Sequence, residues 1–211
     1  MTITAVLLHY WESRLDNIDK IIKSLTQGLR TPNNIILLNN NPKYVLSKSN
    51  VKCINAADNL YSRARYPISL LTPSDYYLFV DDDLMVEKGT LANLEKRAGV
   101  ANLGLMGRKV TGKYSESKII KSTKIKKPTE VDVLIRLYFV PFGGVLKALQ
   151  YEHTHDVGRE DDLALSFSAP AFLVPAGKNE YIKDLDDGGV GIARRANHFG
   201  IRDEVFARLN E

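Results

Sequence analysis

Residues 76–83 have the sequence Tyr-Tyr-Leu-Phe-Val-Asp-Asp-Asp, in which five apolar or aromatic side chains run directly into three carboxylates. A continuous apolar run of this length is typical of a strand buried on both faces, as in a parallel sheet. Ligands of open α/β sheets bind outside the carboxyl ends of the strands, where these acids would lie. Adjacent carboxylates repel one another, and a divalent cation relieves the repulsion. The stretch therefore predicts a metal site, against the alternative that the acids only cap a helix or face water.

The three acids are expected to point in two different directions. Because side chains alternate with a period of two, Asp81 and Asp83 are expected to share a ligand while Asp82 points away. We expect the ion to be Mn²⁺, with Mg²⁺ as the alternative. A neutral imidazole suits Mn²⁺, so His198 is a third candidate metal ligand; the alternative is a structural histidine.

The elements around this stretch predict an α/β fold. Before the acids, apolar runs predict strands at 3–9, 35–38 and 51–54, and helical patterns cover 15–25 and 60–71. This order is typical of a parallel, Rossmann-like half with a mainly parallel central sheet flanked by helices. After the acids we expect helices at 88–98, from 141–144 onward, at 161–167 and at 202–209. Strands are expected at 103–107, 131–133, 137–140 and 171–174, and a loop at 177–191.

Composition restricts the class of protein. The 211 residues carry a net charge of +4 and one cysteine, Cys53, which allows no internal disulfide and favours a reducing, cytoplasmic location. No apolar run reaches the roughly 18 residues of a membrane span, and no signal peptide is evident. We expect one domain, with a nucleotide-binding half at about 1–107 and an acceptor or catalytic half at about 108–211. Membership of a larger multidomain chain stays open, and we expect no nucleic-acid partner.

A second acidic cluster and several basic residues add candidate chemistry. Residues 160–162, Glu-Asp-Asp, precede an apolar helical run, where acids would also simply complement the helix dipole. Arg63 and Arg65 lie near a helix start before the acidic strand, and Arg194 lies near His198. Arginine pairs with phosphate oxygens at fixed geometry, although surface arginines are the alternative. The Lys-rich segment 108–127 predicts a hairpin or loop, either a solvated surface or a contact for an anionic ligand or acceptor.

In order and spacing, these motifs resemble the GT-A glycosyltransferases, which use nucleotide-sugar donors. The resemblance rests on the buried first strand, the Asn-x-x-x-Arg-x-Arg stretch at 59–65, the apolar-Asp-Asp-Asp stretch, the Gly-Gly turn at 143–144, the Glu-Asp-Asp helix and the late histidine. Residues 59–83 and 160–162 are most similar to the exostosin-type branch, which implies retention of the anomeric configuration. The Gly-Arg-Glu-Asp-Asp stretch at 158–162 also resembles a motif of inverting galactosyltransferases, so inversion stays open.

The resemblance implies roles for individual residues. Asp83 and Asp81 would hold the metal that bridges the donor diphosphate, with His198 completing the coordination. Asp161, together with Glu160, would lie at the anomeric carbon. Gly143 and Gly144 would let the backbone approach the sugar. The residues implied to bind the donor are His9, Tyr10, Trp11, Asn39, Arg63, Arg65, Asp81, Asp82, Gly143, Gly144 and Arg194.

The activity implied is transfer of a hexose or deoxyhexose from a UDP-sugar, of the UDP-glucose or UDP-rhamnose type, to a hydroxyl of a glycan or glycoprotein acceptor. One alternative is an inactive carbohydrate- or protein-binding module on the same fold. A second is a sugar-nucleotide nucleotidyltransferase. That class needs a Gly-rich loop after the first strand, whereas residues 9–13 are His-Tyr-Trp-Glu-Ser.

Overall fold

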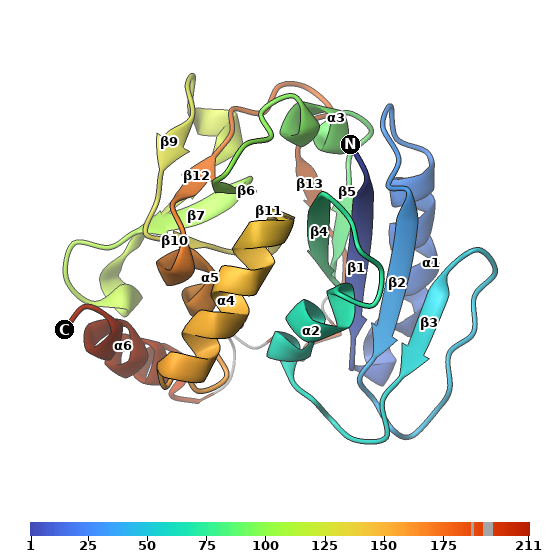
Figure 1. The fold of residues 1–211 in the computed structure, drawn as a ribbon, viewed down its shortest axis with the longest axis horizontal. Helices are drawn as coiled ribbons and strands as arrows, with labels where there is room; N and C mark the ends of the chain where they lie inside the picture. Colours follow the sequence, from blue (N-terminus) through green and yellow to red (C-terminus); the bar gives the residue numbers. More distant parts are fainter. Residues whose placement is uncertain (187, 192–195) are drawn as a thin grey trace.

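The computed structural model describes residues 1–186, 188–191 and 196–211 (Figure 1), so Arg194 lies outside the described residues. The described helices are α1 (Leu15–Thr26), α2 (Arg65–Ser69), α3 (Thr90–Glu95), α4 (Phe142–Thr154), α5 (Asp161–Ser168) and α6 (His198–Leu209). The described strands are β1 (Ile3–His9), β2 (Asn34–Asn39), β3 (Lys52–Asn55), β4 (Tyr76–Asp81), β5 (Leu84–Val86), β6 (Asn102–Gly104), β7 (Met106–Lys109), β8 (Lys118–Lys121), β9 (Thr129–Glu130), β10 (Val133–Leu134), β11 (Leu137–Pro141), β12 (Ala171–Leu173) and β13 (Ile182–Asp184).

The main sheet confirms the predicted α/β class. Its described strands follow the order β3-β2-β1-β4-β11-β6-β12-β9. Strands β1 to β4 are mutually parallel where they pair, and β12 is parallel to β6. Strand β11 runs antiparallel to both of its neighbours, β4 and β6. The carboxyl ends of β1, β2 and β4 therefore meet at one edge of the sheet, which we call the acidic edge because Asp81 ends β4.

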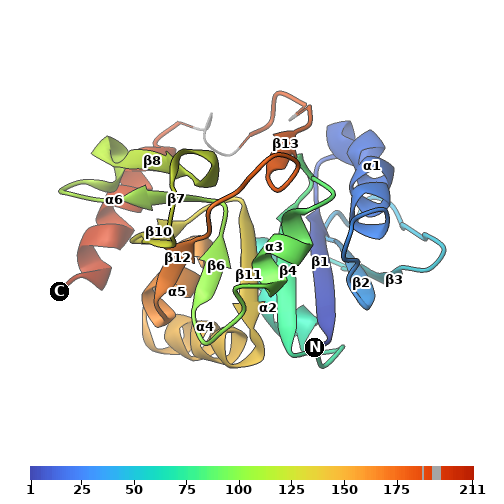
Figure 2. The ribbon, with the colours of Figure 1, turned by 90° about the horizontal axis from the view of Figure 1, so that it is seen from above.

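Strand β4 is buried on both faces, as its apolar run predicts. Leu78 and Val80 pack into the core beneath α1, whereas Tyr77 and Phe79 pack into a second core beneath α2, α4 and α5. The two views show α1 on one side of the sheet and α2, α4 and α5 on the other (Figures 1 and 2). Large side chains on both faces of β4 thus fix the depth and direction of the acids that follow it.

Several predicted boundaries are wrong for local reasons. The expected helix at 60–71 is a 3₁₀ turn (Ser62–Ala64) followed by the short α2, because Tyr61 has a left-handed φ of 60° and Pro67 offers no backbone donor. The expected helix at 88–98 is only α3. Strand β5 follows the acids directly and pairs with β13. Strand β13 lies within residues 177–191, which were predicted to form a loop. Three-residue strands leave too short a pattern to identify.

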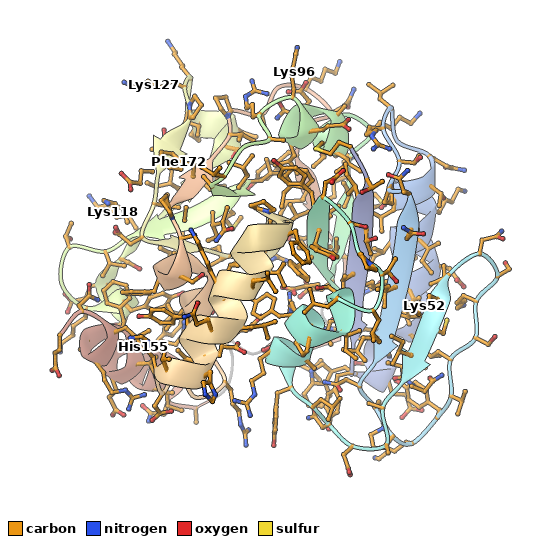
Figure 3. All side chains as sticks on the ribbon, viewed as in Figure 1. Lys52, Lys96, Lys118, Lys127, His155 and Phe172 are labelled. Atoms are coloured by element: carbon orange, nitrogen blue, oxygen red, sulfur yellow. The ribbon has the colours of Figure 1, made fainter. Side chains whose placement is uncertain are left out.

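The Lys-rich segment forms the predicted hairpin. Strands β7 and β8 pair antiparallel and join β10 in a small second sheet. Lys118 and Lys127 extend away from the ribbon into solvent (Figure 3). Helix α6 packs beside this sheet through the buried side chains of Tyr114 and Phe206. In the described part of the chain, none of the helices is long and apolar enough to cross a membrane.

Candidate active site

The three acids separate into one buried and two partly exposed side chains, although only Asp81 belongs to β4, and Asp82 and Asp83 lie in the turn after it. Asp82 is buried, where it contacts His9 Nδ1 at 3.0 Å and accepts a hydrogen bond from Arg14. The side chains of Asp81 and Asp83 are 31% and 18% exposed. Of the three acids, only these two therefore present carboxylate oxygens toward solvent, and Asp82 anchors the end of β4 to the last residue of β1 and to the turn that follows it.

His9 and Asn39 support the site from inside the protein. His9 is fully buried between Asp82 and Tyr44, whose hydroxyl lies 2.7 Å from His9 Nε2. Asn39 is also fully buried and donates to the Tyr44 carbonyl at 2.7 Å and to Asn55 at 3.0 Å. We expected both side chains to line the nucleotide, but in this structure they instead fix the loop that follows β2.

Tyr10 and Trp11 line a cavity at the acidic edge. The cavity has a volume of about 310 Å³ and is bounded on its other side by Asn41, Pro42 and Lys43 after β2. The two rings meet edge to face, with centroids 4.9 Å apart. Aromatic side chains with a polar rim suit a planar heterocycle. This placement is compatible with the predicted contacts to a nucleobase.

Arg65 joins the two acidic clusters. Its Nη1 donates to Asp81 Oδ1 at 3.0 Å, and its Nε lies 3.2 Å from Asp161 Oδ2. Arg65 is only 4% exposed, and its guanidinium carbon lies 5.8 Å from the centre of the Tyr138 ring. Arg63, two residues earlier, is exposed on the preceding turn. The structure thus brings Asp81 and Asp161 together, although 80 positions separate them.

The charges at the acidic edge perturb one another. Burial raises the pKa of Asp81 to about 6, and the negative charges of Asp83, Asp161 and Asp82 add to the increase while Arg65 opposes it. Burial likewise raises the pKa of Asp161 against the stabilising charge of Arg65. Carboxyl groups of raised pKa in a partly open site have an excess of negative charge that a cationic ligand would neutralise.

The second acidic cluster is held by α6. Arg202 Nη1 donates to Glu160 Oε2 at 2.6 Å, and Nη2 donates to Asp162. Burial raises the pKa of Glu160 to about 7, although Arg202 opposes the shift. His198 begins the same helix one turn before Arg202, and residues four apart share a helix face. Asp161, the first residue of α5, is the member that turns toward Arg65 and β4.

Arg14 and Arg136 were not predicted, yet both contact the acids. Arg14 Nη2 lies 3.3 Å from Asp83 Oδ2, and Arg136 Nη2 donates to Asp83 Oδ1 at 3.1 Å. Arg14 lies on a 3₁₀ turn after β1, and Arg136 lies between β10 and β11. No motif surrounds either residue, and only the folded chain brings them to β4.

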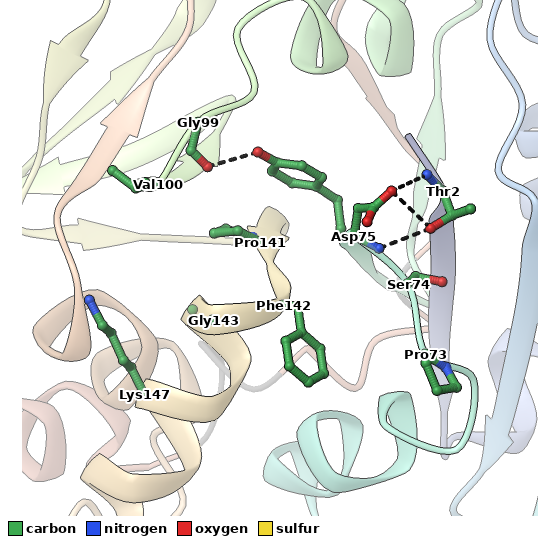
Figure 4. Close-up of a pocket in the computed structure, with 12 residues that line it drawn as sticks. Thr2, Pro73, Ser74, Asp75, Gly99, Val100, Pro141, Phe142, Gly143 and Lys147 are labelled. Carbon is green, nitrogen blue, oxygen red and sulfur yellow. Dashed lines mark hydrogen bonds between the residues drawn. The ribbon is translucent and has the colours of Figure 1, made fainter.

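The structure does not bring Gly143 and Gly144 to the acidic edge, where the resemblance would place them. Strand β11 is antiparallel to β4, so Pro141, the residue before α4, pairs with Tyr76 at the start of β4. At about 3.3 Å per residue, that position lies roughly 16 Å from Asp81 along the strand. The two glycines instead line a cavity of about 810 Å³ at the opposite edge of the sheet, beside Phe142 and Lys147 (Figure 4).

The carboxylates of Asp81 and Asp83 suit a divalent cation whose remaining coordination positions are filled by oxygens from outside the protein. They offer oxygen donors from alternate positions, and their shared negative charge is only partly neutralised by arginine. Among residues 1–186, 188–191 and 196–211, no three or more His, Cys, Asp or Glu side chains form a group that could hold a metal. The expected set of Asp81, Asp83 and His198 is therefore not assembled here, and phosphate and water oxygens would supply the remaining ligands.

Comparisons with known proteins show the fold. No family model matches the chain, and no curated protein matches it in sequence. The crystal structure of a 1–349 fragment of S. aureus TarS in complex with UDP-GlcNAc is similar, with a TM-score of 0.63 and 13% identity over 99% of this chain and 66% of that one. The same fragment with UDP has a TM-score of 0.57 and 13% identity over 88% of this chain and 61% of that one.

A longer TarS structure gives a TM-score of 0.60 at 13% identity, covering all of this chain but 43% of that one. The chain thus spans less than two thirds of the length of these solved structures. At this identity the similarity concerns the fold alone. The chain has the GT-A-like glycosyltransferase fold: a large, mainly parallel sheet flanked by helices.

Proposed function

We propose that this chain is a metal-dependent glycosyltransferase that moves a hexose or deoxyhexose from a UDP-sugar to a hydroxyl of a glycan acceptor, with retention of configuration. The observation that carries the proposal is that Arg65 joins Asp81 to Asp161 at the sheet edge where Asp83 also lies, two residues after Asp81. The cavity beside Tyr10 and Trp11 opens at the same edge. The structures of TarS with UDP-GlcNAc and UDP support a uridine nucleotide as the ligand class.

The reaction breaks the bond between the anomeric carbon and a diphosphate oxygen, so the leaving diphosphate gains negative charge. A divalent cation on Asp81 and Asp83 would supply electrostatic stabilisation of that charge. Tyr10 and Trp11 would bind the base. Arg65 holds the Asp81 and Asp161 carboxylates in place, since it is buried and contacts both.

Asp161 is the residue that we place at the anomeric carbon. Its Oδ2 is buried and accepts no hydrogen bond from any described residue, although Arg65 Nε lies 3.2 Å away. A carboxylate there stabilises the positive charge that develops on the sugar. With retention, it acts in that way or as a nucleophile; with inversion, its raised pKa suits a base that removes the acceptor proton.

A calorimetric panel of nucleotide sugars tests the proposal. UDP-glucose, UDP-rhamnose, UDP-GlcNAc and a GDP-sugar are titrated into the chain with and without Mn²⁺. We expect manganese-dependent binding of one UDP-sugar by the wild type. Asp83→Ala should lose it, whereas Arg30→Ala should keep it, because Arg30 pairs with Glu95 and Met1 at the other end of the sheet. Absence of binding to any donor would contradict the proposal, and binding without turnover would favour the inactive module.

A further inference from the structure

Arg136 has an unusual backbone conformation. Its φ is 75°, and the N–H of Leu137 donates to the carbonyl of Ile135 at 3.0 Å, which closes a γ-turn around it. The γ-turn with positive φ is a rare and strained form, and a long side chain at positive φ is uncommon. The turn is held by further bonds from the Arg136 N–H to the Tyr138 hydroxyl at 3.2 Å and from Ile135 to β7. Strain of this kind persists where the surrounding structure enforces it, and it is concentrated at functional sites.

The strained turn directs the Arg136 guanidinium to the acidic edge. Nη2 donates to Asp83 Oδ1 at 3.1 Å, and Nη1 donates to Asp184 on β13. Arg14 approaches the other oxygen of Asp83 at 3.3 Å. In the protein alone, the carboxylate that we assign to the metal is therefore contacted on opposite oxygens by two guanidinium groups, each of which is shared with a second carboxylate.

The two arginines differ in how firmly they are held. Arg14 is 8% exposed in its side chain and is also bound to the buried Asp82. Arg136 is 27% exposed, and its second partner, Asp184, is 74% exposed. Ion pairs with solvent-exposed partners contribute little to stability. Arg136 is thus free to exchange partners, whereas Arg14 is fixed.

We propose that Arg136 binds the β-phosphate of the donor, exchanging the Asp83 carboxylate for a phosphate when a divalent cation reaches Asp83. The inference rests on the proposed function and adds a diphosphate-binding residue to it. The Arg136 guanidinium would be repelled from Asp83 by a dication held there, and it would then lie near the phosphate oxygens that such an ion attracts. The planar fork of arginine matches two phosphate oxygens at once. Arg136 therefore competes with the metal in the free protein and cooperates with it in the complex.

Opposite effects on two ligands would distinguish this role from a structural one. Arg136→Gly removes the side chain while its backbone adopts φ 75° without strain, so the variant should fold. By calorimetry we expect it to bind Mn²⁺ alone about threefold or more tightly, because a positive charge has left Asp83. It should bind UDP in saturating Mn²⁺ about 10- to 100-fold more weakly, as expected for a charged hydrogen bond. UMP, which lacks the β-phosphate, should be affected by less than about threefold.

Two variants complete the test. Arg136→Lys keeps the charge without the fork and should bind UDP with intermediate affinity. Arg30→Ala removes an arginine of similar exposure, 25%, that is also paired with a carboxylate, and should leave all three ligands unchanged. Equal UDP affinity in wild type and Arg136→Gly, or equal losses for UDP and UMP, would overturn the inference while the proposed function stands. A wild type that binds no UDP would overturn both.

Discussion

Replacing Arg65 tests the link between the two acidic clusters most severely. Arg65→Met keeps much of the side-chain volume but removes the only cation that contacts both Asp81 and Asp161 among the described residues. Breaking a buried ion pair on one side costs about 3–5 kcal/mol, because the remaining charge is left uncompensated. For a domain of this size, about 2–4 °C of melting temperature is lost per kcal/mol, so we expect a decrease of roughly 6–20 °C at pH 8.

The decrease should depend on pH. At pH 5.5 the two carboxyl groups of the variant take up protons, because their pKa values rise further once Arg65 is absent. The gap in melting temperature between variant and wild type should therefore be smaller at pH 5.5 than at pH 8. Thermal denaturation followed by circular dichroism measures both values. Arg30→Met is the control; Arg30 pairs with Glu95, both side chains are partly exposed at 25% and 29%, and the loss of this pair should cost no more than about 1 kcal/mol. A gap under about 2 °C, or one equal at both pH values, would refute the bridging role.

Three further predictions follow from the site. Asp161→Asn should bind UDP-sugar within about threefold of wild type yet lose about 10²-fold or more in transfer rate, as for a group that acts on the transition state; loss of binding in calorimetry would instead make Asp161 a binding residue. Gly144→Ala should cost about 1–3 kcal/mol in urea unfolding, because its Cβ would lie 2.6 Å from Asn102 Oδ1, and it should leave UDP affinity unchanged; a large loss of affinity would contradict its placement at the opposite edge. The pKa values of Asp81, about 6, and of Glu152 and Glu160, about 7, exceed the values near 4 of the unfolded chain, so the folded state binds these protons more tightly. Their contribution to the free energy of unfolding should therefore fall as the pH rises from about 4 to about 7, and urea titrations that show it rising over that range would contradict the assigned burial.

The sequence predicts the parts of the site that depend on strand periodicity. The apolar run locates β4 and its burial on both faces, because a strand has only two faces. Asp82 is buried and Asp83 partly exposed, but both lie in the turn after β4, so strand alternation does not determine their directions. The sequence also places Arg65 near a helix start shortly before β4, whereas its contact with Asp81 is seen only in the folded chain. These features are local, and each depends on neighbouring residues.

The parts that the sequence misses depend on long-range geometry. The resemblance implies that Gly143 and Gly144 lie beside the sugar, but the antiparallel direction of β11 places them at the other edge of the sheet. Nothing in the residues around Leu137 indicates that direction. Arg136 reaches Asp83 only through a γ-turn between β10 and β11, and arginine gives no sequence signal for positive φ. Likewise, the burial of His9 against Asp82 depends on the pairing of β1 with β4.

The most direct test of the central claim is a crystal structure of the chain grown with UDP and MnCl₂, with anomalous data collected at the manganese edge. We predict an anomalous peak between the Asp81 and Asp83 carboxylates and the diphosphate, with the uracil in the cavity beside Tyr10 and Trp11. UDP bound instead in the cavity at the start of β4, beside Phe142 and Lys147, or a manganese peak away from the acidic edge, would contradict the account.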